Sequence, residues 1–471
     1  MYISMRTTKS LLASLLLGQA IAHPGCPAGP GGPAPDLSKY DNASTIERDV
    51  AIIGGGASGT HAAVQLRKMG HSVVVVEREP LLGGHTNTYR DPVSGQHIDY
   101  GVQVWQNIPE ARDFLAHFNI STTTVQLGRS NSARVDLRTG QTVPPPQGNV
   151  TEAMMRYVMH LLQYPFLEQG WNLPDPVPED LLLPFGEFVK KYDLAPAVET
   201  LTLYAQGLKD WLQYPTIYIM KHFSLGVALG AQNGFLASVD GNNGALYEAA
   251  LKELGADALL SSIVVSMERP ADRPHRILVR TRKGYQLINA KKTIITAPPK
   301  LENLANFDLD DTERGVFGQF ENTFYYTTVV RVPGLPAGLD ILNRAADTPY
   351  NIPHLPGVYA MLPSRVPDIY TIYYGGGEAK TENEVKKSIR DSVMMLREAQ
   401  FNTSEPEILA INNHSPFALF VSADKIAKGF YRNLYALQGQ RNTYYTGAAF
   451  HTHDSAAVWR FTDNLLKTMF A

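Results

Sequence analysis

Three glycines at a fixed spacing follow a short apolar segment near the start of the chain. Gly54, Gly56 and Gly59 fit the pattern G-x-G-x-x-G, and the residues DVAII before them have the branched, apolar character of a buried parallel strand. The first glycine permits a tight turn, the second lets the backbone approach a pyrophosphate, and the third lets a helix pack closely on the strand. The spacing therefore predicts a turn that binds phosphate.

The elements around these glycines complete a dinucleotide-binding unit. Ala57 and Ser58 lie in the turn, and a helix is predicted over residues 60–69, where its N-terminal N–H groups would face the phosphates. Gly70 ends this helix, and HSVVVVE predicts a second strand that finishes at Glu77. A carboxylate about 20 residues beyond the glycines can accept hydrogen bonds from ribose hydroxyls. The unit predicts a dinucleotide site, but both FAD and NAD share the adenosine half that it would bind.

The residues after Glu77 carry a resemblance to a known superfamily. Gly83-Gly84-His85 comes first, and Asp99-Tyr100-Gly101 follows it. This order resembles the flavin-containing amine oxidoreductase superfamily, in which a Gly-Gly-Arg or similar element lies along the pyrophosphate and an Asp-x-Gly segment comes next. Within that superfamily, GGHTNTY followed by IDYGVQ looks like the fungal beta-cyclopiazonate dehydrogenase family. The resemblance implies FAD as the cofactor. It also implies that five residues lie near FAD: Arg78, Gly84, His85, Thr86 and Gln103.

Two later segments extend the resemblance. In the first, a strand of the superfamily usually lays a backbone amide against the adenine, here that of Val264, and a hairpin-like pair then ends in Ala297-Pro298-Pro299. In the second, a strand runs into Gly447, which by resemblance would abut the pyrophosphate or the ribityl chain. Asp454 or Ser455 is a natural N-cap for the helix that follows, and a positive helix end suits the pyrimidine end of the flavin.

These segments predict an α/β fold in two domains. A Rossmann-like FAD-binding domain would be assembled from the separated residues 48–102, 241–301 and 443–471. The remaining residues, 103–240 and 302–442, would form an α+β substrate domain, as in two-domain flavoproteins of the amine-oxidase type. Apolar positions at i, i+3 and i+4 predict helices in this domain over residues 150–170 and 185–208, and a further helix is expected over residues 382–401. Strands are expected over residues 323–332 and 369–376.

Candidate catalytic residues are few, because flavin itself accepts hydride and the protein need only bind, orient and tune. His451 and His453 stand just before the helix expected to face the flavin, where one imidazole could contact the reduced flavin or take a substrate proton. The alternative is that both are structural or solvent-exposed. No metal site is predicted, because two histidines and the neighbouring carboxylate lack further convergent ligands.

Two other groups of side chains stay open. His85 replaces the more usual Arg, so it would either contact the pyrophosphate region or carry a covalent link to the flavin. Tyr326 is a weak catalytic candidate within a set of strand tyrosines expected either to wall the substrate pocket or to pack in the core. Because side chains alternate along a strand, only one of each adjacent pair can face the pocket. The set comprises Tyr325, Tyr326, Tyr373 and Tyr374.

Composition and the N-terminus bear on the class of protein. The chain has 471 residues, a formal net charge of −3 and one cysteine, Cys26. No concentrated run of Lys or Arg supports nucleic-acid binding. Residues 1–22 have the pattern of a signal peptide, residues 23–47 form a Pro/Gly-rich tail, and no later apolar segment approaches the roughly 20 residues of a membrane helix. Five sequons favour a secreted protein with N-linked glycans, at Asn42, Asn119, Asn149, Asn402 and Asn413.

Three functions remain open on these grounds. The first is a secreted FAD-dependent oxidase or dehydrogenase that takes a hydride from an organic small molecule, such as a fungal-type secondary metabolite, onto flavin N5. Oxygen or another acceptor would then reoxidise the flavin. The second is an amine oxidase that acts on C–N bonds and releases peroxide, and the third is a non-catalytic flavin-binding glycoprotein. The substrate, the electron acceptor and the oligomeric state are not readable from the residues.

Overall fold

The computed structural model describes residues 37–40, 45–127 and 131–470. Every described residue belongs to one compact unit within residues 35–471. The expected signal peptide, most of the Pro/Gly-rich tail and the sequon at Asn42 lie outside the described residues. Within the described part of the chain, no helix combines the length and the apolar character that crossing a membrane requires.

The first sheet is assembled from three segments that are far apart in the sequence. Its order is β8-β2-β1-β11-β10-β9, and β19 also pairs with β11. Strands β8, β2, β1, β11 and β19 run parallel, whereas β10 and β9 are antiparallel. The strands are β1 (Ile46–Ile53), β2 (Val73–Val76), β8 (Ala258–Leu259), β9 (Ile263–Glu268), β10 (His275–Thr281), β11 (Gly284–Ile295) and β19 (Thr443–Tyr445).

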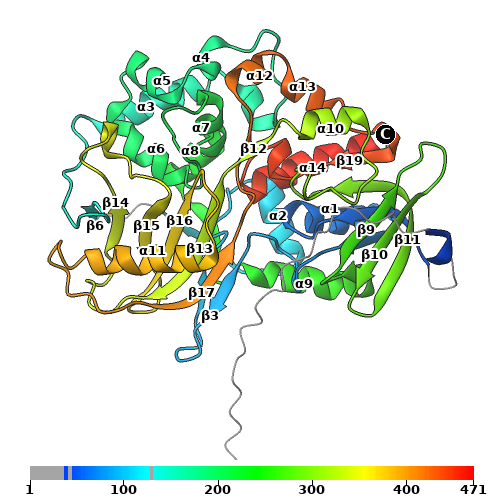
Figure 1. Cartoon of the computed structure of the whole chain (residues 1–471), viewed down its shortest axis with the longest axis horizontal. Helices are drawn as coiled ribbons and strands as arrows, with labels where there is room; N and C mark the ends of the chain where they lie inside the picture. The colour runs from blue at the N-terminus through cyan, green and yellow to red at the C-terminus, as the bar shows by residue number, and fades with distance from the viewer. Residues whose placement is uncertain (1–36, 41–44, 128–130, 471) are drawn as a thin grey trace, which may run out of the picture. The chain divides into compact units, whose positions relative to one another are not determined.

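Four helices pack on one face of this sheet (Figure 1). They are α1 (Ala57–Lys68), α2 (Pro109–His117), α9 (Gly244–Leu254) and α14 (Ser455–Met469). Alternate residues of β1 point to opposite sides, so Val50 and Ile52 pack under these helices while Ala51 and Ile53 join the larger core on the other face. Parallel strands covered on both faces explain the unbroken apolar runs in β1 and β2.

The second sheet has the order β17-β13-β16-β15-β14-β6, and its pairs are antiparallel except for β14 with β6. Helix α11 (Glu382–Met395) packs on one face through Val385, Ile389 and Val393, and Figure 1 shows it lying across the strands. The strands are β6 (Ser132–Val135), β13 (Phe324–Arg331), β14 (Asp340–Asn343), β15 (Gly357–Pro363), β16 (Ile369–Gly376) and β17 (Glu407–Asn413).

Helices cover the opposite face of the second sheet, where Tyr325, Tyr359 and Tyr373 join the large core. These helices are α3 (Val150–Leu161), α4 (Glu179–Leu182), α5 (Phe185–Lys191), α6 (Val198–Tyr204), α7 (Thr216–His222) and α8 (Leu225–Asn233). The remaining elements are α10 (Asp311–Phe317), α12 (Ala423–Ala427), α13 (Phe430–Tyr435) and the two-stranded pairs β3 (Thr88–Arg90) with β4 (His97–Asp99), β5 (Thr122–Val125) with β7 (Phe235–Ser238), and β12 (Glu321–Asn322) with β18 (Leu419–Phe420).

The expected segments therefore build the expected sheets, but the core of the first part is larger than residues 48–102, 241–301 and 443–471. Trp105 and Phe114 pack in the same cluster as Val50 and Ile52, beyond the expected boundary at residue 102. The Phe114 ring meets the Trp459 indole at 4.9 Å between centroids. Side chains of helix α2 thus complete the cover of the first sheet.

Candidate functional site

In the glycine turn, the fold itself requires glycine at positions 54 and 59 but not at position 56. Gly54 has φ +109°, and a Cβ on Gly59 would lie 1.9 Å from the Gly54 carbonyl oxygen, so helix α1 packs directly on the turn. Gly56, the N-cap of α1, has φ −69°, which any residue adopts. A Cβ there would meet only the Gly84 Cα, at 3.8 Å. Gly56 thus faces open space that a ligand can fill.

A second glycine loop lies beside the first. The Gly83 amide donates to the Gly55 carbonyl at 2.8 Å, and Gly83 and Gly84 both have positive φ, +112° and +57°. No side chain caps the N-terminus of α1 among the described residues, so its first amides and the positive helix end face this space. The two glycine loops and the uncapped N-terminus of α1 together form a cradle suited to a pyrophosphate.

Glu77 lies at the end of β2, buried, next to this cradle. Its Oε2 accepts from the Gly55 amide at 2.6 Å and its Oε1 accepts from the Glu79 amide at 2.8 Å. Burial raises the pKa of Glu77 and outweighs these bonds, which lower it. Because each carboxylate oxygen has a second lone pair, a carboxylate oriented in this way can still accept from ribose hydroxyls.

The C-terminal segment reaches the same place. A Cβ on Gly447 would lie 3.2 Å from the Thr296 carbonyl oxygen and 3.4 Å from Ser58 Oγ, so Gly447 borders the first helical turn of α1. The Trp459 indole of α14 donates to the Ala57 carbonyl at 3.1 Å. These contacts join the start of α1 and the start of α14.

Asp454, rather than Ser455, is the N-cap of α14. Its Oδ1 accepts from the Ala457 amide at 2.9 Å, and its Oδ2 accepts from Gln106 Nε2 at 3.0 Å. Burial raises the pKa of Asp454. The hydroxyls of Ser455 and Thr86 lie close enough to Tyr247 to lower its pKa, although burial raises it more strongly. The buried Thr86 and Tyr247 oxygens have no hydrogen bond of ordinary geometry within the described residues.

Three other residues expected at the site show no direct contact with the glycine loops in the described residues. Arg78 is largely exposed beside Glu79. The backbone amide bonded to the Glu77 carbonyl oxygen belongs to Ser262, at 2.8 Å, and Val264 comes two residues later in β9. Gln103 donates from Nε2 to the Asp99 carbonyl at 3.2 Å. The structure thus supports the glycines, Glu77 and the start of α14 as one site more directly than these three residues.

The residues around this space fit a flavin dinucleotide. Gly56 leaves room where a Cβ would protrude, the two glycine loops and α1 offer amides to phosphate, and Glu77 can bind a sugar. The start of α14 supplies a second positive helix end, and the unpaired Thr86 and Tyr247 hydroxyls offer further polar contacts. In the described residues, no three His, Cys, Asp or Glu side chains are grouped as metal ligands.

Histidines from three segments lie together beside this cradle. The His85 ring stacks on His414 at 4.2 Å between centroids and lies 6.4 Å from His453, nearly parallel to it. His453 packs on Phe417 at 4.1 Å. Burial lowers the pKa of His85 to about 4 and holds those of His414 and His453 well below the usual value. All three imidazoles are therefore neutral at pH 7.

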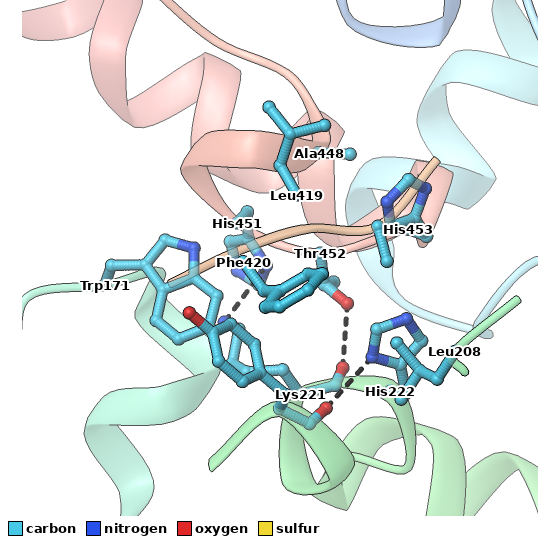
Figure 2. A pocket seen from close by; sticks show the side chains of 12 residues that line it. Trp171, Leu208, Lys221, His222, Leu419, Phe420, Ala448, His451, Thr452 and His453 are labelled. Carbon is cyan, nitrogen blue, oxygen red and sulfur yellow. Dashed lines mark hydrogen bonds between the residues drawn. The ribbon is translucent and has the colours of Figure 1, made fainter. Parts of the chain in front are cut away.

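A small cavity lies beside this cluster, toward the helices that cover the second sheet (Figure 2). Its lining includes His451 and His453 from the segment before α14, Lys221 and His222 from the end of α7, and Trp171. The remaining lining residues are Leu208, Tyr218, Ala418, Leu419, Phe420, Ala448 and Thr452. The cavity is therefore bounded both by the segment before α14 and by the helices that cover the second sheet.

Both ring nitrogens of His451 are bonded within the protein. Lys221 Nζ lies 3.4 Å from Nδ1, and Nε2 lies 3.1 Å from the Glu168 carbonyl oxygen, to which it donates. Lys221 also donates to the Leu167 and Gly170 carbonyls, at 2.6 and 3.1 Å, and burial lowers its pKa to about 7. His451 thus forms part of the cavity wall, and both of its ring nitrogens already have partners in the protein.

The strand tyrosines divide between the two faces of the second sheet. Tyr325 stacks near Phe417, at 4.7 Å, and lies 6.2 Å from Tyr373, on the side of the histidine cluster. Tyr326 and Tyr374 pack with α11 on the other side, and the Tyr326 hydroxyl donates to the Lys380 carbonyl at 2.7 Å. Tyr326 therefore lies on the face of the sheet that α11 covers, and Tyr325 lies on the face of the histidine cluster.

Sequence reasoning missed three residues of this region: His414, His222 and Lys221. His414 stands inside the sequon Asn413-His-Ser, and His222 and Lys221 end a short apolar helix. None of them belongs to a spaced motif, so the only available signal is a polar residue within an otherwise apolar helical stretch. Lys221 and His414 make contacts with residues that are 230 and 327 positions away in the sequence.

Solved structures of two flavoprotein-like neighbours share this architecture. The chain superposes on the CLA-producing fatty acid isomerase from P. acnes with TM-score 0.74 and 20% identity, covering 90% of this chain and 99% of that one. Putrescine oxidase bound to putrescine gives TM-score 0.65 and 16% identity, over 91% and 100% of the two chains. At such identities the likeness concerns the fold alone. Fold and cradle together define a two-domain α/β flavoprotein of the amine-oxidase type.

Sequence relatives narrow the class. A family model described as an NAD(P)-binding Rossmann-like domain matches residues 52–118. The FAD-dependent oxidoreductase oblC of Cochliobolus heterostrophus is 36% identical, over 98% of both chains. Beta-cyclopiazonate dehydrogenase of Aspergillus flavus is 36% identical, over 90% of this chain and 93% of its own length. The chain belongs to this family of fungal FAD-dependent oxidoreductases, which confirms the expected oxidoreductase and its cofactor, FAD.

Proposed function

We propose that the protein is a secreted enzyme that removes a hydride and a proton from an organic small molecule bound beside FAD, next to the small cavity. Bound FAD would supply the hydride acceptor, its N5 atom. The observation that carries the proposal is the continuity of the two sites. His453 lines the cavity, and the next residue, Asp454, caps the helix that begins at the FAD cradle.

The residues of the chain have definite tasks in this reaction. The glycine loops and Glu77 fix the cofactor, while the aromatic side chains beside the cavity exclude water and orient a flat substrate. Phe417 and Tyr325 form one aromatic group with Tyr373 and His453, and Phe420 belongs to a second group with Tyr214 and Tyr218. Neutral imidazoles nearby can receive a proton at pH 7.

The charge of the cavity indicates the class of substrate. Among its described lining residues there is one ammonium, that of Lys221, and neither Asp nor Glu is present. An ammonium substrate would face a like charge here, which costs binding energy, whereas a neutral or acidic aromatic compound would not. This favours a secondary metabolite of that chemistry over a simple amine, in line with the relative named for beta-cyclopiazonate.

The test is anaerobic bleaching of the purified yellow protein by a panel of donors. We expect flat neutral or acidic compounds, with beta-cyclopiazonate among them, to bleach the flavin, and putrescine to leave the spectrum unchanged. Admission of air and a peroxide assay then identify oxygen as an acceptor. Bleaching by putrescine alone would establish an amine oxidase, and a flavin that no donor reduces would make the protein a binding protein.

Secretion and glycosylation belong to the same proposal. The asparagine of each described sequon is exposed, so a glycan could be attached without unfolding. These residues are Asn119, Asn149, Asn402 and Asn413. Expression of the full chain in a fungal host should deliver the protein to the medium, with a mass that falls on treatment with a peptide N-glycosidase. An unglycosylated protein retained in the cells would contradict this part of the proposal.

The acid test for the flavin link uses the same preparation. The half-buried His85 ring stacks on His414 and lies at the glycine loop, so both a simple contact and a covalent bond are open to it. Flavin colour that stays with the acid-precipitated protein indicates the covalent bond, and its loss in His85→Gln would assign the bond to this residue. Yellow supernatant indicates a non-covalent contact.

A further inference from the structure

One side chain at the cavity has a basic nitrogen with no partner among the residues that the structure describes. His222 is the last residue of α7, and its Nδ1 lies 2.9 Å from the Tyr218 carbonyl oxygen. A carbonyl oxygen can only accept, so Nδ1 must carry the proton and donate it. In the neutral ring the lone pair is then on Nε2, which is buried and has no hydrogen-bond partner among the described residues.

The position of His222 relates it to both the cavity and the cofactor site. Figure 2 shows His222 and His453 entering the cavity from different segments, and their ring centroids lie 5.9 Å apart. His453 in turn lies 6.4 Å from His85 of the second glycine loop. His222 thus lines the cavity beside His453, which lies between it and His85 of the second glycine loop.

The other imidazoles of the cavity are less suited to take a proton. Both nitrogens of His451 are bonded to protein groups. No hydrogen bond within the described part of the chain fixes the tautomer of His453, whereas the Tyr218 carbonyl fixes that of His222. Burial and the nearby Lys221 ammonium lower the pKa of His222, against the bond to Tyr218, so the ring is neutral and ready to accept at pH 7.

We propose that Nε2 of His222 is the proton acceptor of the reaction, a catalytic residue that rests on the proposed function above. One C–H bond of the substrate breaks with its electron pair, which leaves as hydride to FAD. A proton leaves the adjacent carbon, nitrogen or oxygen for Nε2 of His222. The electron pair of that second bond forms the new double bond of the product. Lys221 and Glu168 hold the neighbouring wall through His451.

The first arm of the test needs no substrate. Long-range proton–nitrogen NMR spectra of the FAD-loaded protein, labelled with ¹⁵N-histidine, report the tautomer of each ring, and the His222→Asn variant assigns the signal. We expect the neutral Nδ1–H form for His222 at pH 7. An Nε2–H form or a doubly protonated ring would overturn the assignment, because neither has a free lone pair on Nε2.

The second arm uses a donor found by the bleaching panel. Asn at position 222 can keep a donor near Nδ1 for the Tyr218 carbonyl while it removes Nε2. We expect His222→Asn to slow bleaching by the donor about 100- to 10,000-fold, the range of general-base catalysis. Its FAD content and its reduction by dithionite should equal those of the wild type.

A matched control lies outside the cavity. His160 of α3 also has a buried ring nitrogen without a partner in the described chain, and its ring packs on Tyr192 at 3.9 Å. His160→Asn should bleach at the wild-type rate. Equal rates in the wild type and His222→Asn overturn the base assignment alone, whereas a wild-type flavin that no donor bleaches overturns the proposed function and the assignment with it.

Discussion

Replacing Gly56 with Ala should separate the needs of the fold from those of the cofactor. Gly56 has φ −69°, so Ala adopts its backbone conformation without strain. The added Cβ would approach only the Gly84 Cα, at 3.8 Å, which is ordinary contact. Replacing Gly at a compatible position typically raises the free energy of unfolding by about 0.4–1 kcal/mol. The FAD-free variant should therefore be at least as stable as the wild type.

The same methyl group would occupy space that the pyrophosphate needs. Overfilling a packed contact costs roughly 1–3 kcal/mol. Since 1.4 kcal/mol is tenfold in affinity, the Kd for FAD should rise about 5- to 150-fold. Titration of deflavinated protein with FAD, followed by flavin fluorescence, measures the Kd, and urea unfolding of the same samples measures stability.

Gly59→Ala is the matched control, because its Cβ would lie 1.9 Å from the Gly54 carbonyl oxygen. That contact forces helix α1 away from the turn, so this variant should lose stability as well as FAD. If Gly56→Ala binds FAD with the wild-type Kd, the backbone at Gly56 does not approach the cofactor and the cradle described above is misplaced.

Three further changes test separate parts of the molecule. Glu77→Gln puts an amide NH₂ against a backbone N–H and leaves a buried donor unpaired, at about 1–3 kcal/mol, so FAD titration should show a weaker Kd; an unchanged Kd would remove Glu77 from the site. Arg269→Met leaves the Glu313 carboxylate buried without its main partner, and urea unfolding should show a loss of about 3–5 kcal/mol. Burial lowers the pKa of Lys221 from 10.5 to about 7, so between pH 7 and pH 10.5 the unfolded chain binds more protons than the folded chain. The free energy of unfolding of the wild type should therefore rise by up to about 1.4 kcal/mol per pH unit over this range. Lys221→Met should lack this rise, and a wild-type stability that falls relative to the variant over the same range would refute the burial of the ammonium.

The cofactor half was predictable because its requirements are local. A tight turn, a close backbone approach and a helix start each need a specific residue type at a specific place, so Gly54, Gly59 and Asp454 occupy the expected positions. Helix α1 begins at Ala57 rather than at residue 60, since Gly56 already acts as its N-cap. Trp105 and Phe114 lie beyond the expected boundary at residue 102 and join that core only through tertiary packing, which no local pattern shows.

The substrate half was less predictable because its chemistry arises between distant segments. Strand alternation shows that one of Tyr325 and Tyr326 faces the pocket, but the helix that packs on the sheet decides which one, and no local pattern announces that helix's position. In the sequence, His222 is only a polar residue at the end of an apolar helix. Its free nitrogen becomes apparent only when the Tyr218 carbonyl and the cavity are seen together.

The segment before α14 explains why the cavity is rich in imidazole. Asp454 must stay buried to cap α14, and Gln106 holds its second oxygen, so the helix start cannot move away from the cradle. The residues directly before it are then confined to the boundary between the two halves. His451 and His453 both belong to this short stretch, with His451 bonded to Lys221 and His453 beside His222 and Phe417. The start of α14 thus fixes which of the preceding side chains line the cavity, and the proposed base, His222, lines the same cavity from the end of α7.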